Sequence, residues 1–242
     1  MLKSTYRNFI LDNSLAAVSA IPYTDYTLAT DGSTCVIHKI APDGTNLHCH
    51  PTLRPLRRIR SVDSDCLITA LGCCNNPNLY ILNHHLAEQD SIEIRLPYRS
   101  YNADCTTYGF CNHEEGIAEM TDASIVTIGS QRYIAVAYTK GAYLYDLNGI
   151  CLAQLCKTDC NEILTDFICL PDGAFAMVTL CGNTQTFSIC RNDTMQSAVL
   201  SHSRRLRMLI EENGEIYGLF GKNYIYNQII KIFSDSILVS AT

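Results

Sequence analysis

Residues Glu162–Leu200 read EILTDFICLPDGAFAMVTLCGNTQTFSICRNDTMQSAVL, and this stretch decides the fold class. It holds four apolar, β-prone runs, and a short polar segment separates each run from the next. These segments are Pro171-Asp172-Gly173, Cys181-Gly182-Asn183 and Arg191–Thr194. Short runs bounded by Gly, Pro, Asn and Asp are typical of strands joined by tight hairpins. The stretch therefore predicts an antiparallel meander of four strands.

The same order of four runs recurs along the chain. We place the units at about residues 5–40, 56–96, 124–155, 162–200 and 205–242. A four-stranded sheet cannot bury both of its faces alone, whereas radial repetition lets each sheet cover the next one. Five units in 242 residues average about 48 residues each, which is in the range of a propeller blade.

These units resemble the β-propeller class, and the resemblance covers nearly the whole chain. It implies an all-β protein with one domain, a five-bladed β-propeller of four-stranded antiparallel blades. The Gly-His and Trp-Asp pairs of WD40 repeats are missing, the sequence contains no Trp, and the kelch pattern is absent. No particular propeller family is therefore indicated, and a β-sandwich or a pair of β domains is the alternative architecture.

The second run of each unit carries small residues, which predicts close packing of the sheets near a central axis. They are Ala16, Ala17, Ala70, Ala135, Ala137, Ala176 and Gly218. In this alignment the ring closes by face packing alone, since the chain starts with strand one and ends with strand four. If the register is offset, Leu2–Ile10 instead pairs with the C-terminal unit.

Composition excludes several classes of function. The net charge of −6 argues against general nucleic-acid binding, because neutralising phosphates needs a basic surface. No apolar run approaches the roughly 18 residues that a membrane span needs, and polar residues interrupt the N-terminal segment. We therefore expect a cytoplasmic protein without a membrane partner. The thirteen cysteines are expected to be reduced thiols, several of them buried in strands.

Two segments between units, Ala41–Pro55 and Pro97–Ala123, are longer than ordinary loops. In a meander, the connector after strand four and the turn between strands two and three emerge at the same end. We expect both segments on one face, together with turns such as that at Asp25. The candidate partner-binding residues on this face are His48, His50, Arg54, Tyr98, Arg99, Tyr101, Asp104, Tyr108, His113, Arg204 and Arg205. Tyr, Arg and His are enriched at recognition sites.

Other motifs are weaker. The spacing of His48-Cys49-His50 matches no standard zinc site, and no Gly-rich phosphate-binding loop occurs, so we expect no metal and no cofactor. Arg54, Arg57, Arg58 and Arg60 form one basic run, and Arg204, Arg205 and Arg207 form a second. These runs could bind an anion, but a solvated strand edge protected by charge is the favoured interpretation.

For a hydrolase we consider the carboxylates that the resemblance places near the funnel, because some five-bladed propellers are glycoside hydrolases. They are Asp12, Asp65, Asp122, Asp166 and Asp172, although three of them fall in turns where Asp is ordinary. The sequence favours a non-enzymatic binding module for a protein or peptide partner. The alternative is a small carbohydrate-active propeller, a lectin or glycoside hydrolase, with an axial pocket that carboxylates line.

Overall fold

The computed structural model describes most of the chain, and every regular element in the described residues is a β-strand. The described residues are 6–11, 17–23, 25–61, 68–72, 78–94, 120–159, 161–170, 172–191, 194–200, 205–212, 214–222 and 226–232. Within these ranges, no helix is long and apolar enough to cross a membrane. The all-β class predicted from the hairpin pattern is confirmed.

The strands form five four-stranded antiparallel sheets. The first sheet contains β2 (Ser19–Tyr23), β3 (Tyr26–Thr30), β4 (Val36–Ile40) and β5 (Asn46–Pro51). The second contains β6 (Leu56–Ser61), β7 (Ile68–Gly72), β8 (Asn78–Leu82) and β9 (Glu88–Glu93). The third contains β10 (Met120–Ile128), β11 (Gln131–Tyr138), β12 (Gly141–Tyr145) and β13 (Cys151–Lys157). The fourth contains β14 (Ile163–Cys169), β15 (Phe175–Cys181), β16 (Thr184–Arg191) and β17 (Thr194–Val199). The fifth contains β18 (Arg205–Glu212), β19 (Glu215–Lys222), β20 (Tyr226–Ile232) and β1 (Tyr6–Phe9).

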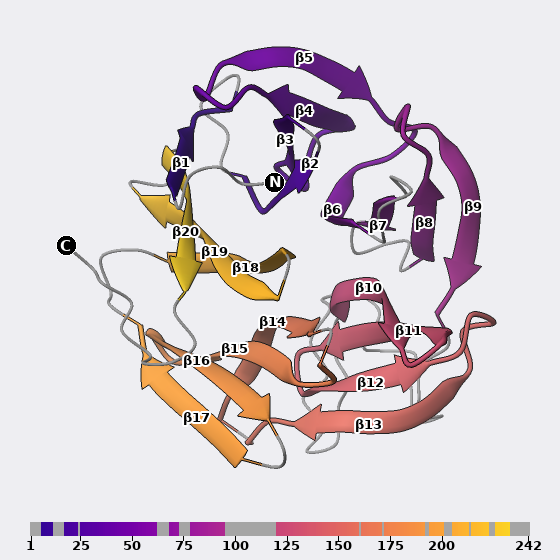
Figure 1. Ribbon diagram of the computed structural model, residues 1–242, viewed down its shortest axis with the longest axis vertical. Coiled ribbons are helices and arrows are strands. Elements are labelled where there is room, and N and C mark those ends of the chain that lie inside the picture. The colour runs from indigo at the N-terminus through magenta and orange to yellow at the C-terminus, as the bar shows by residue number, and fades with distance from the viewer. Residues whose placement is uncertain are drawn as a thin grey trace, which may run out of the picture.

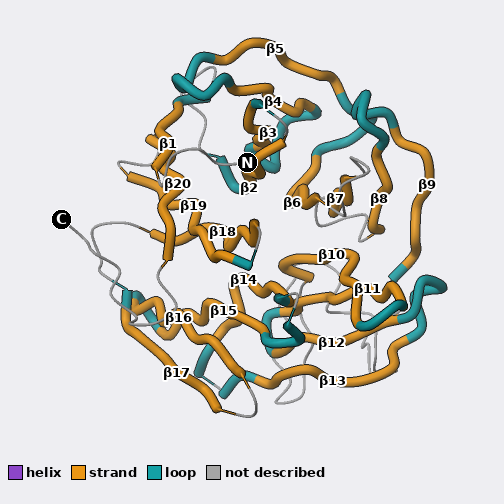
Figure 2. Tube along the Cα trace, in the orientation of Figure 1, coloured by secondary structure: helices purple, strands orange, loops and turns teal. Residues whose placement is uncertain are grey.

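The sheets are arranged around a common axis, with β2, β6, β10, β14 and β18 innermost (Figure 1). Neighbouring sheets touch in sequence, through β2 with β6, β7 with β10, β11 with β14 and β14 with β18. Contact between β18 and β2 closes the ring. In the first four sheets consecutive strands pair in chain order, so each of them follows an up-and-down path (Figure 2). This arrangement is that of a β-propeller.

The first unit differs from its predicted boundaries. β1 does not begin the first sheet but pairs antiparallel with β20, with Tyr6 opposite Ile230 and Phe9 opposite Asn227. The first sheet accordingly spans Ser19–Pro51 and not residues 5–40. The physical reason is that pairing the two ends of the chain closes the ring with backbone hydrogen bonds, which face packing alone does not supply. The offset register is thus the one observed, and the predicted last strand, residues 237–240, lies outside the described residues.

Two further expectations change with this offset. Asn46–Pro51 is the outer strand of the first sheet, so the segment Ala41–Pro55 is not a long loop. Asp25 lies between the first and second strands of its sheet, and therefore emerges at the opposite end from the one predicted. Both errors have the same cause, since they arise from counting β1 as the first strand of the first sheet.

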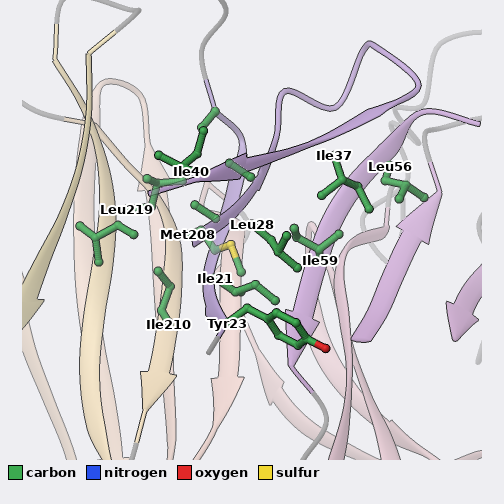
Figure 3. Close-up of a cluster of buried hydrophobic side chains, with 14 of the residues drawn as sticks. Ile21, Tyr23, Leu28, Ile37, Ile40, Leu56, Ile59, Met208, Ile210 and Leu219 are labelled. Atoms are coloured by element: carbon green, nitrogen blue, oxygen red, sulfur yellow. The ribbon is translucent and has the colours of Figure 1, made fainter. Parts of the chain in front are cut away.

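Hydrophobic cores lie between neighbouring sheets. The largest joins the fifth, first and second sheets, and its buried side chains include Leu219, Leu28 and Ile59 (Figure 3). Small residues allow close packing in the second strands, as predicted, since Ala135 and Ala176 are buried there. In the first sheet Ala29 of β3 takes the place expected for Ala16 and Ala17.

A buried amide fastens the seam of the ring. Asn227 Oδ1 accepts a hydrogen bond from the Ala17 backbone N–H at 3.1 Å and another from Arg207 Nη1 at 3.2 Å. Asn227 Nδ2 donates to the Phe9 carbonyl oxygen at 3.4 Å. Asn227 is fully buried, so water cannot take over these hydrogen bonds if the amide is removed.

We expect Asn227→Ala to lower the free energy of unfolding by about 2–3 kcal/mol, because it leaves buried donors and an acceptor unsatisfied. Urea-induced unfolding measures this loss. Asn148→Ala, in an exposed turn, is the matched control and should change stability by about 0.5 kcal/mol or less. Equal losses in the two variants would show that the seam does not depend on Asn227.

Candidate functional site

Four of the inner strands share an irregularity near their first residues. Their pairing with the second strand shifts after Leu56, Met120, Leu164 and Leu206, as in a β-bulge. The residues that resume the pairing are Arg58, Asp122, Asp166 and Met208. Arg58 of the second sheet lies 3.8 Å from Asp166 of the fourth sheet, so these side chains meet across the axis.

A cluster of four charged residues occupies this position: Arg58, Arg60, Asp122 and Asp166, here called the central ion cluster. Arg60 holds it together. Its Nε donates to Asp122 Oδ2 at 2.9 Å, and its Nη2 donates both to Asp122 Oδ2 and to Asp166 Oδ1, the latter at 3.2 Å. Its Nη1 donates to the Leu209 carbonyl oxygen at 2.7 Å. The side chains of the two aspartates are only 1–2% exposed.

The remaining bonds of the cluster extend to the other sheets. Arg58 Nη1 donates to the Val18 carbonyl oxygen, and Arg58 Nη2 donates to the Arg207 carbonyl oxygen at 2.8 Å. The Leu209 backbone N–H donates to Asp166 Oδ2. The cluster therefore connects the second, third, fourth and fifth sheets and the residue that precedes β2 of the first.

Ser19 adds a neutral link between the first two sheets. Its Oγ donates to the Ile59 carbonyl oxygen at 3.1 Å and accepts from the Ile59 N–H at 2.9 Å. Ser19 is fully buried. Most of the described polar groups at the axis are thus hydrogen-bonded, as burial requires, although Arg58 Nε has no hydrogen-bond partner among them.

The two arginines and two aspartates of the cluster carry opposite charges in equal number. Burial raises the pKa of Asp166 to about 7, because desolvation of the carboxylate outweighs the attraction of Arg60. The nearby Asp122 raises it further, while Arg58 and the Leu209 N–H oppose the increase. Burial also disfavours the charge of Arg60, but Asp122 and Asp166 outweigh that effect and raise its pKa. Arg60 is therefore the fixed positive charge around which the carboxylates are arranged.

The residue within each bulge makes a second set of bonds. Thr121 Oγ1 donates to the Ala137 carbonyl oxygen at 3.2 Å, and Thr165 Oγ1 donates to the Val178 carbonyl oxygen at 3.1 Å, each within its own sheet. Arginines at the equivalent positions reach the next sheet. Arg57 Nη1 donates to the Met120 carbonyl oxygen at 3.2 Å, and Arg207 Nη1 donates to that of Ala17 at 2.8 Å. A Cβ atom on Gly221 would overlap the Arg207 guanidinium, so a larger residue there would require that guanidinium to move.

The prediction that the basic run around Arg57–Arg60 is a solvated strand edge is therefore wrong. The run lies on β6, an innermost strand, and Arg58 and Arg60 are buried. The physical reason is charge compensation, because Asp122 and Asp166 of two other sheets neutralise these arginines inside the ring. Arg205, in the second basic run, begins β18 and is exposed.

The other described candidates lie on outer elements. His48 is exposed and His50 is half-buried, and both are in the outer strand β5. Arg54 contacts the second sheet, since its Nη1 donates to the Tyr80 hydroxyl at 2.8 Å and its guanidinium lies 4.3 Å from the centre of that ring. Arg54 Nη2 also lies 3.4 Å from Glu88 Oε2.

The remaining candidates lie outside the described residues. They are Tyr98, Arg99, Tyr101, Asp104, Tyr108, His113 and Arg204. Those that are described are not brought together, since His48 and His50 lie on the outer strand of the first sheet and Arg205 lies on the inner strand of the fifth.

The candidate carboxylates for a hydrolase do not form one site in the described residues either. Asp12 and Asp65 lie outside the described residues, and Asp172 lies in an exposed turn beside Arg191. Of the three candidates that the structure describes, Asp122 and Asp166 meet at the axis. The missed signal is the repeated Thr-Asp pair, Thr121-Asp122 and Thr165-Asp166, near the beginning of two inner strands.

The two carboxylates at the axis are both bonded to Arg60. General acid–base catalysis requires a carboxyl group within hydrogen-bond reach of a substrate, but both carboxylates are buried and bonded to Arg60. In the described part of the chain, no three His, Cys, Asp or Glu side chains are grouped so as to hold a metal ion.

Comparison with known proteins defines the class of this fold. No protein-family model matches the chain, and no curated protein matches it. Virginiamycin B lyase from Staphylococcus aureus is similar in structure, with a TM-score of 0.54 and 11% identity over 94% of this chain and 99% of that chain. A protein of unknown function from Bacteroides caccae gives a TM-score of 0.53 and 12% identity over 95% of this chain and 82% of that chain.

The WD40 repeats of RRP9 give a TM-score of 0.50 and 9% identity over 88% of this chain and 60% of that chain. At such identities the likeness concerns the fold alone. Together with the ring of sheets, it shows that the chain has the architecture of a β-propeller.

We expect Arg60→Met to lower the free energy of unfolding by about 3–5 kcal/mol, because it leaves two buried carboxylates without their main partner. Urea-induced unfolding at neutral pH measures the loss. Arg191→Met is the matched control. Arg191 forms an exposed ion pair with Asp172, so this variant should lose about 1 kcal/mol of stability or less. Similar losses in both variants would contradict a structural role for the cluster.

The raised pKa of Asp166 predicts a pH dependence. Between its ordinary value near 4 and about 7, the native state binds a proton that the unfolded state releases, so the contribution of Asp166 to stability falls as pH rises. The difference in unfolding free energy between the wild type and Asp166→Asn should therefore decrease from pH 4 to pH 7.5. Asp172→Asn serves as the control variant in the same series, and an increase over this interval for Asp166→Asn would mean that the pKa is lowered instead.

Proposed function

We propose that the chain is a five-bladed β-propeller that acts as a non-enzymatic interaction module for a protein or peptide partner. The five sheets are its blades, and the series of contacts that runs from the first sheet through the fifth and back supports this count. Propellers host many unrelated functions, so the fold alone does not choose among them.

The observation that carries the proposal is the burial of the two carboxylates at the axis. Asp122 and Asp166 are both bonded to Arg60 and are almost fully buried, so neither is presented to a ligand. A glycoside hydrolase needs two carboxyl groups that flank the bond it cleaves. The alternative of a carbohydrate-active funnel therefore lacks an accessible pair among the described residues, and recognition is better assigned to the surface.

The proposed surface is the connector end of the ring, defined as the end where each sheet has its turn between strands two and three. β9 ends and β10 begins at this end, because outer strands finish where the next inner strands start. Residues 97–115 lie in the chain between these two strands. We assign the partner contacts to this segment and to the other candidates predicted from the sequence, so that the full set is His48, His50, Arg54, Tyr98, Arg99, Tyr101, Asp104, Tyr108, His113, Arg204 and Arg205. Aromatic and arginine side chains supply most of the binding energy at interfaces.

A cytoplasmic location is part of the proposal. Six of the described cysteines, among them Cys35 and Cys181, are free thiols. Free thiols in this number are typical of a reducing compartment, since secreted proteins usually pair their cysteines.

We expect affinity purification from the native source to recover a partner with the wild type and to lose it when residues 97–115 are deleted. Arg205→Glu should reduce recovery, because it reverses an exposed charge at the connector end. Arg191→Glu reverses an exposed charge at the opposite end of the fourth sheet and should leave recovery unchanged. Circular dichroism verifies that each variant is folded. Full recovery after the deletion would contradict the assignment of this surface.

A further inference from the structure

The outer strands of the sheets differ in how their free edges are protected. Within the described part of the chain, no strand pairs with the outer edge of β5, β9, β13 or β17. Unpaired strand edges invite pairing with another chain, and proteins commonly block them with charges, proline or bulges. β9 carries Glu88, Asp90 and Glu93, and its pairing with β8 is interrupted once.

The strands β5 and β13 are blocked in other ways. β5 ends in Pro51, and its pairing with β4 is interrupted between Lys39 and Ile40. β13 ends in Lys157, and its pairing with β12 is interrupted at two places. Each of these edges is therefore irregular or carries a blocking residue.

β17 has none of these protections. Its sequence, TMQSAV, contains no charge, no proline and no glycine. Its pairing with β16 is continuous, from Thr194 opposite Arg191 to Val199 opposite Thr186. Met195 is 50% exposed and Val199 is 68% exposed. The strand lies at the rim of the ring, where another molecule can reach it (Figure 1).

We propose that the outer edge of β17 pairs antiparallel with the same edge of a second copy of this chain. Such a contact is two-fold symmetric and joins two four-stranded sheets through main-chain hydrogen bonds. Centred between Gln196 and Ser197, it places Met195 opposite Ala198 and Thr194 opposite Val199 of the other copy. Apolar and β-branched residues directly opposite one another stabilise a strand pair.

Charge does not oppose a second copy at this edge. The chain carries a net charge of −6, so most contacts between two copies bring like charges together. Self-pairing of β9 in the same manner would set Glu88 opposite Glu93. β17 brings no charged side chain to the contact, and the second copy offers the same uncharged edge.

The size of the contact sets its strength. A pair of six-residue strands buries less than the roughly 1,600 Å² of a standard interface, so the dimer should be weak and dependent on concentration. Because no charged group of β17 takes part, the affinity should be nearly independent of salt.

Sedimentation velocity on the full chain, over a series of protein concentrations at low and high salt, tests this inference. The wild type should show a reversible monomer–dimer equilibrium, and Gln196→Lys should weaken dimerisation at least tenfold, because it sets a positive charge from each copy beside the two-fold axis. Gln89→Lys is the matched control, an exposed glutamine on the outer strand β9, and it should not change the equilibrium.

Three results would overturn the inference. They are a monomer at every concentration, a dimer that Gln196→Lys leaves intact, and a dimer that high salt dissociates. Thermal unfolding followed by circular dichroism checks that both variants keep the fold, as expected for exposed residues.

Discussion

The ion pairs that Arg60 makes with Asp122 and Asp166 are the interaction on which this ring depends. The inner strands β6, β10 and β14 come close together at the axis, where Arg60 meets Asp122 and Asp166. Burying four charges costs free energy, and the cost is offset only if every charge finds a partner. The cluster meets this condition for its carboxylates, since each is bonded to Arg60 and to a backbone N–H, that of Ala123 or Leu209.

The central ion cluster and the seam between β1 and β20 stabilise different parts of the ring. The hydrophobic cores join each sheet to its neighbours, but a ring also needs its first and last sheets held together. Pairing of β1 with β20 supplies this in the outer part of the fifth sheet, and Asn227 extends it inward to Ala17 and Arg207. Arg207 in turn accepts from Arg58 through its carbonyl oxygen, so the seam is connected to the cluster.

Local patterns predicted the sheets well and the long-range pairings poorly. The strands of Glu162–Leu200 were predictable because hydrophobic runs and turn residues lie next to each other in the sequence. The partner of β1 was not, because it depends on closing a ring between residues more than two hundred positions apart. The central ion cluster was missed for a related reason. Asp122 and Asp166 were candidates by position, but only the bulges and the ring geometry bring them to Arg60, so the arginine run was interpreted as a solvated edge.

The buried cluster couples four sheets directly and reaches the first sheet through Val18. Amide hydrogen exchange on the wild type and Asp122→Leu tests this coupling most directly. If the cluster ties the ring, protection should fall together in β2, β6, β10, β14 and β18, including strands that do not touch Asp122. A loss of protection confined to β6 and β10 would contradict the account, because it would reduce the cluster to a local ion pair between two neighbouring sheets.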